Sequence, residues 1–130
     1  MPPGTSDAAL TVMQALPIDG VVLVTTPQQL AGMVVHKAVN MLKQMNKNIL
    51  AIVENMSFFV CPSCDARHEI FGPSHAQANA EASGLEDWLR LPLDMAVTQR
   101  SDAGEVEALD TSLMKELAEK IMTLPGNDCA

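Results

Sequence analysis

The sequence has no tyrosine, and its aromatic residues are three phenylalanines and one tryptophan. Basic residues are also scarce: eight lysines and arginines stand against sixteen acidic residues, for a net charge of −8. Nucleic acids and anionic membranes attract clustered positive charge, so this balance argues against both as partners. The apolar run from Gly20 to Val24 is far too short to span a bilayer, and no signal peptide is recognisable.

Cysteine is rare as well. Three cysteines are an odd number and too few for a disulfide scaffold, which predicts a reducing, cytoplasmic location with thiols free to bind metal. Apolar residues nevertheless make up 48% of the chain, a globular composition. The length of 130 residues predicts a single domain over residues 1–130, with a frayed tail at 125–130.

Two continuous, β-branched apolar runs dominate the first half of the chain. Gly20–Thr26 and Asn48–Glu54 are typical of parallel strands buried on both faces. Between them, apolar residues at three- and four-residue steps predict a helix that begins at Pro27. Strand, helix and strand make a right-handed βαβ unit.

The remaining segments extend this pattern into an α/β fold, a mostly parallel sheet with helices on both faces. The predicted elements are a helix capped by Thr5 or Ser6 and ending near Leu16, a loop over Asn55–Pro73, a helix over Ser74–Ala82, a short strand over Asp87–Leu91, and a helix from about Leu109.

Ligands of such sheets bind at the carboxyl ends of the strands. Four features fall there and together predict a ligand edge: Pro2–Thr5, Thr25–Pro27, Glu54–Asn55 and Pro92–Asp94. In the first of them, Gly4 would let a backbone N–H approach a phosphate oxygen closely.

The motif Cys61-Pro62-Ser63-Cys64 places two thiolates within reach of one metal ion or cluster. Three interpretations stay open on spacing alone. His68 could complete a zinc site, two copies of the chain could share a cluster or a zinc ion, or the pair could cycle as a thioredoxin-type disulfide.

Several strings in order resemble the Mrp/ApbC-type P-loop ATPases, a family of iron–sulfur cluster carriers. The matching segments are Met1–Asp7, Val24–Gln28, Val53–Cys64, Ile70–Gly72, Leu91–Asp94 and Arg100–Gly104. The resemblance implies a fold like MinD and the nitrogenase iron protein. It also implies a homodimer that bridges a [4Fe–4S] cluster through Cys61 and Cys64 and delivers it to apo-proteins. It further implies nucleotide contacts at Gly4, Asn55, Pro92 and Asp94.

The departures from that family are as informative as the matches. No Gly-Lys-Ser or Gly-Lys-Thr string occurs, and the family's Asp before Met1 is absent. The chain therefore resembles the C-terminal portion of the family protein. We expect the ATP and Mg²⁺ site to be incomplete here and ATP hydrolysis to be absent in this chain alone. A separate N-terminal half is a possible partner. The other function classes left open are a zinc-stapled dimerisation module and a thiol redox protein.

Overall fold

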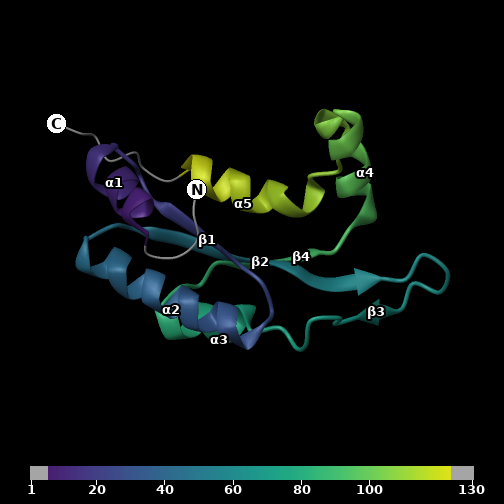
Figure 1. The fold of residues 1–130 in the computed structure, drawn as a ribbon, viewed down its shortest axis with the longest axis horizontal. Coiled ribbons are helices and arrows are strands. Elements are labelled where there is room, and N and C mark those ends of the chain that lie inside the picture. Colours follow the sequence, from purple (N-terminus) through teal and green to yellow (C-terminus); the bar gives the residue numbers. More distant parts are fainter. Residues whose placement is uncertain (1–5, 124–130) are drawn as a thin grey trace.

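The computed structural model describes residues 6–123 (Figure 1). Its described part contains four strands, five α-helices and one short 3-10 turn. Their order is α1 (Asp7–Ala15), β1 (Val21–Thr25), α2 (Gln29–Gln44), β2 (Ile49–Val60), β3 (Arg67–His68), α3 (Ala76–Ser83), β4 (Trp88–Pro92), α4 (Met95–Ala103), η1 (Val106–Ala108) and α5 (Ser112–Thr123). The predicted cap at Thr5 and the tail at 125–130 lie outside the described residues.

Strand β2 forms the centre of the sheet. It pairs in parallel with β1 on one side and with β4 on the other, so that Ile52 lies opposite both Leu23 and Trp88. Its far end pairs antiparallel with β3. The mostly parallel α/β sheet expected from the apolar runs is confirmed.

Helices cover both faces of this sheet. Figure 1 shows α2 and α3 on one face, and α1, α4 and α5 on the other. The best-packed core lies beneath α2 and α3, where apolar side chains from both helices meet the central strand. This cluster comprises Val35, Val39, Ile52 and Ala80, with Leu23, Ile49 and Leu85 packed against it.

The start of the first helix and the end of the third carry the residues that the sequence predicts for them. The Ser6 hydroxyl accepts a hydrogen bond from the Ala9 N–H at 3.4 Å, which caps α1. Gly84 ends α3 in the left-handed conformation at φ 75°, where a side chain would be strained.

The prediction of a loop over Asn55–Pro73 is wrong for residues 55–60, which belong to a strand. β2 continues through Val60, and β3 returns beside it as a hairpin. The apolar, aromatic run Ser57–Val60 supports this extension, because its backbone pairs with β4 as well as with β3.

Three helix starts also differ from expectation. α2 begins at Gln29 instead of Pro27, α3 at Ala76 instead of Ser74, and α5 at Ser112 instead of Leu109. Helix α4 was not predicted, although both of its ends carry recognisable signals. Asp94 caps its start by accepting from the Ala96 N–H at 2.8 Å, and Gly104 ends it at φ 73°.

Strand β1 is the edge of the sheet within the described residues. On this strand Val24 is 67% exposed, and the neighbouring α2 surface adds exposed Leu30, Met33 and Val34. No residue of β1 carries a charge, so the edge lacks the usual protection against pairing with another strand.

Across residues 6–123, each helix is too short or too polar to cross a membrane.

We expect the unprotected edge to make the isolated chain self-associate. Val24→Lys places a charge on β1 and should slow the growth of light scattering on mild heating by about threefold or more. Met122→Lys is the matched control, because it adds the same charge at an exposed position on α5, away from the edge. Equal protection by both substitutions would mean that net charge, and not the edge, controls association.

Candidate functional site

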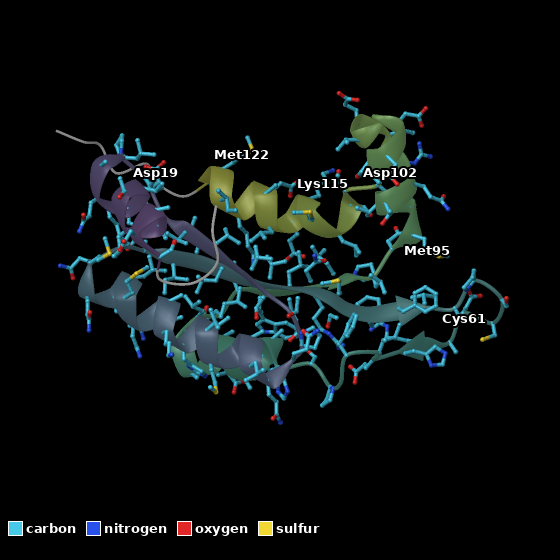
Figure 2. All side chains as sticks on the ribbon, in the orientation of Figure 1. Asp19, Cys61, Met95, Asp102, Lys115 and Met122 are labelled. Carbon is cyan, nitrogen blue, oxygen red and sulfur yellow. The ribbon has the colours of Figure 1, made fainter. Side chains whose placement is uncertain are left out.

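The two cysteines of the C-x-x-C motif lie at the tip of the β2–β3 hairpin. The Cys61 N–H donates to the Ala66 carbonyl at 3.0 Å, and the Asp65 N–H donates to the Cys61 carbonyl at 2.9 Å. Asp65 adopts the left-handed conformation at φ 56°, which lets the chain turn tightly. The hairpin extends away from the helices at the far end of the sheet, with Cys61 at its end (Figure 2).

Both thiols are free and reachable from solvent. Cys61 is half-buried and Cys64 is exposed. The nearby backbone N–H groups of Ser63 and then of Cys64 lower the pKa of the Cys61 thiol. A lowered pKa favours the thiolate, which is the form of cysteine that binds soft metal ions.

The described residues bring no complete metal site together in one chain. Within residues 6–123, no group of three His, Cys, Asp or Glu side chains is placed to hold a metal ion. His68 is exposed on β3 opposite Phe59 and joins no such group. A zinc site completed by His68 within one chain therefore has no support in this structure.

A bulge separates the buried part of β2 from the hairpin. Between Glu54 and Phe58 the pairing with β4 shifts register, and Met56 takes a left-handed conformation at φ 54°. The Glu54 side chain is fully buried and accepts hydrogen bonds from the Ser57 hydroxyl at 2.5 Å and from the His75 N–H at 2.9 Å. This carboxylate thereby joins the two sides of the bulge to the start of α3, where helix polarity favours a negative charge.

Arg90 on β4 completes this network. Its Nε donates to the Ser57 hydroxyl oxygen at 2.7 Å and lies 4.0 Å from the Glu54 carboxylate. Its Nη2 donates to Glu69, just after β3, at 2.7 Å. On the hairpin itself, the Arg67 guanidinium lies 3.8 Å from the centroid of the buried Phe58 ring, a cation–π contact.

A second candidate region lies where β1 and the parallel part of β2 end. A cavity of about 340 Å³ is lined there by Val24, Thr25, Thr26, Ala31, Val34, Val35 and Asn55. The Asn55 side-chain oxygen accepts from the Met56 N–H at 3.0 Å, which orients its amide. Two of the four predicted edge features therefore share one cavity, and Gly4 lies outside the described residues.

Pro92 and Asp94 lie around a different cavity. It measures about 300 Å³ and is lined by Phe59, Val60, Pro62, Pro92, Leu93, Asp94 and Met95. The structure thus brings Pro92 and Asp94 beside the cysteine hairpin and does not bring them into the cavity of Asn55. The extension of β2 causes this, since Pro92 pairs with Phe58 beyond the bulge.

Sequence reasoning did not identify Glu54 and Arg90 as a pair. The available signal was a carboxylate at the end of a buried apolar strand, which needs a partner to offset the cost of burial. Nothing in the spacing identifies that partner, because 36 positions separate the two residues and strand pairing alone makes them neighbours.

Comparison with known proteins agrees with this architecture. Residues 1–124 match the ParA family described as "NUBPL iron-transfer P-loop NTPase". Since the match extends over nearly the whole chain, the protein belongs to this family, and the resemblance noted in its motifs is confirmed.

Individual relatives carry related names. The chain is 40% identical over 126 residues to an iron–sulfur cluster carrier protein of Pyrococcus abyssi, covering 93% of this chain and 43% of that protein. It is 41% identical over 105 residues to the iron–sulfur cluster transfer protein NUBPL of Mus musculus, covering 81% of this chain and 33% of that protein.

A solved structure is also similar. It is a nucleotide-binding protein from Archaeoglobus fulgidus in complex with ADP, with cobalt found in it. The TM-score is 0.79 and the identity is 41%, and the match covers 88% of this chain and 47% of the other. The chain thus spans less than half of each of these three proteins.

The N–H groups around Cys61 predict that it is more reactive than Cys64. In the metal-free chain, alkylation of Cys61 should outpace that of Cys64 near neutral pH, because its lowered pKa leaves more thiolate. Mass spectrometry of alkylated peptides measures both rates, and the same chain in denaturant is the control in which the difference disappears. Equal rates in the folded chain would contradict the role assigned to the turn.

Proposed function

We propose that this protein is an iron–sulfur cluster carrier, in which Cys61 and Cys64 hold a [4Fe–4S] cluster between two subunits and pass it to apo-proteins. The observation that carries the proposal is the pair of free thiols at the tip of an extended hairpin. Family membership supports it, because the family is described as iron-transfer proteins. Thiolates are also the ligands that such clusters prefer.

The number of ligands supports a homodimer. A [4Fe–4S] cluster binds four cysteines, and within residues 6–123 the only cysteines are Cys61 and Cys64. A two-fold axis through the hairpin tips would supply the same pair twice. Exposed apolar side chains of the hairpin and of the segments next to it, Val60, Ile70, Phe71 and Met95, give a second copy a surface to cover.

The proposed transfer is an exchange of ligands and involves no redox change. Thiolates of the acceptor protein replace Cys61 and Cys64 on the iron atoms one at a time. Each acceptor thiol gives up its proton as it binds, and each released cysteine can take one up. The exposed Cys64 is the more accessible ligand for the first exchange, and the two thiols return to the free state seen here.

Nucleotide binding is proposed as a property of the longer family proteins. The cavity with Asn55 suits the base side of ATP, and Gly4, Pro92 and Asp94 are the other contacts that the resemblance implies. This chain supplies no Gly-Lys-Ser/Thr loop for the phosphates and Mg²⁺. A further proposed partner is a segment that corresponds to the N-terminal half of the relatives, which would cover the exposed edge of β1.

The hairpin distinguishes this proposal from a thiol redox function. Thioredoxin-type pairs sit at the start of a helix, whereas a turn follows Cys61 here and leads into β3. A dimer held together by zinc would use the same four thiolates. Analysis of the bound metal distinguishes it from a dimer that bridges a cluster. Because thiols and labile clusters need a reducing compartment, we place the proposed activity in the cytoplasm.

The cysteine pair gives a direct test of the bridging cluster. After anaerobic reconstitution, we expect absorbance at about 400 nm and bound iron in the wild-type chain. Cys61→Ser or Cys64→Ser should abolish the iron and weaken the dimer, whereas Cys129→Ser should change neither. A colourless dimer with stoichiometric zinc, or full iron retention in Cys64→Ser, would rule out the proposed site.

The lack of a phosphate-binding loop predicts weak nucleotide binding. We expect no measurable ATP hydrolysis by this chain alone and a dissociation constant no tighter than roughly millimolar, about −4 kcal/mol. Calorimetry with Mg·ATP measures this, and Asn55→Ala should weaken what binding remains. Micromolar affinity in the unmodified chain would show that its other residues hold the phosphates.

A further inference from the structure

Arg90 occupies a special place between the central sheet and the cysteine hairpin. It lies on β4, yet its guanidinium reaches the strand that leads out to the cysteines and the segment that returns from them. On the outgoing side, Nε donates to the Ser57 hydroxyl oxygen at 2.7 Å. On the returning side, Nη2 donates to the Glu69 carboxylate, also at 2.7 Å. One planar side chain thus connects three separate backbone segments.

The anchor beneath Arg90 is rigid because it is buried. Glu54 is fully buried, and its two oxygens are both engaged, one by Ser57 and one by the backbone N–H of His75. Ser57 is also fully buried, and its hydroxyl both donates to Glu54 and accepts from Arg90. Moving any of these groups would leave a buried polar atom without its partner.

The hairpin needs such a connection because its own pairing is short. β3 has two residues, and its described ladder consists of the pairs Phe59–His68 and Val60–Arg67. A two-stranded hairpin is marginally stable in water when it has no further support. The Arg67 contact with Phe58 adds one support, and Arg90 adds the other by holding Glu69.

We infer that Arg90 is a positioning residue for the cysteine hairpin. Its two hydrogen bonds hold the outgoing and returning segments against β4, so that Cys61 and Cys64 meet a cluster in a fixed arrangement. The cluster part of this inference rests on the proposed function, whereas the fastening of the hairpin does not. Lysine cannot replace Arg90 fully, because one ammonium group lacks the fork that reaches both partners.

The test compares three variants of the full chain, first without metal. Hydrogen exchange followed by mass spectrometry should be about tenfold faster or more over residues 59–68 in Arg90→Met. Glu69→Gln removes only the charged contact of Arg90 with the returning segment, so it should speed hydrogen exchange of the same peptides by a smaller factor. This variant keeps the test valid if Arg90→Met folds poorly. Lys120→Met is the matched control. It breaks the ion pair with Asp87 just before the same strand and should leave the hairpin within about twofold of wild type.

The second measurement is made after cluster reconstitution. Arg90→Met should lose the cluster to a chelator about fivefold faster than wild type and show a changed visible circular dichroism spectrum, with Arg90→Lys intermediate. If hydrogen exchange over residues 59–68 is as slow in Arg90→Met as in the wild type, Arg90 does not hold the hairpin in place. Faster exchange with unchanged cluster loss and spectrum would overturn the role in positioning the thiols. If the wild-type chain binds no cluster, the proposed function fails, and the exchange data alone decide whether Arg90 fastens the hairpin.

Discussion

The pairing of β2 with every other described strand is the constraint on which the rest of the structure depends. Its first half, Ile49–Glu54, is buried between β1 and β4 and forms the core with α2 and α3. Its second half leaves that core and carries the cysteine hairpin. The bulge at Asn55–Ser57 lies between the halves, so one strand connects the cavity beside Asn55 with the tip that carries the thiols.

Burial of Glu54 makes this connection specific. A carboxylate without exposed surface is stable only where hydrogen bonds and positive charge surround it. Ser57, the start of α3 and Arg90 supply these, and each belongs to a different part of the chain. The same groups that satisfy the buried charge therefore also determine how the hairpin leaves the sheet. Stability of the core and placement of the cysteines depend on one set of contacts.

The candidate sites differ in how completely this chain builds them. The cysteine turn is formed, and its N–H groups lower the pKa of Cys61, but within residues 6–123 it offers two thiols and no third ligand. The cavity with Asn55 is formed by β1, α2 and β2 and is open beside the exposed edge of the sheet. Both sites are therefore open to completion by further protein. In the proposed function, a second copy of the chain completes the cysteine site, and a segment like the N-terminal half of the relatives covers the cavity with Asn55.

Local patterns in the sequence determined the strands of the core, the start of α1, the end of α3 and the C-x-x-C motif. Continuous apolar runs, the Ser6 cap, Gly84 and the Cys61–Cys64 spacing each act over a few residues, so they can be interpreted without a structure. Tertiary structure decided what depends on distant partners. The extension of β2 to Val60 required β3 and β4 beside it, and the separation of Pro92 from Asn55 followed from that extension. The Glu54–Arg90 network arose in the same way, because strand pairing brings together side chains that no sequence spacing relates.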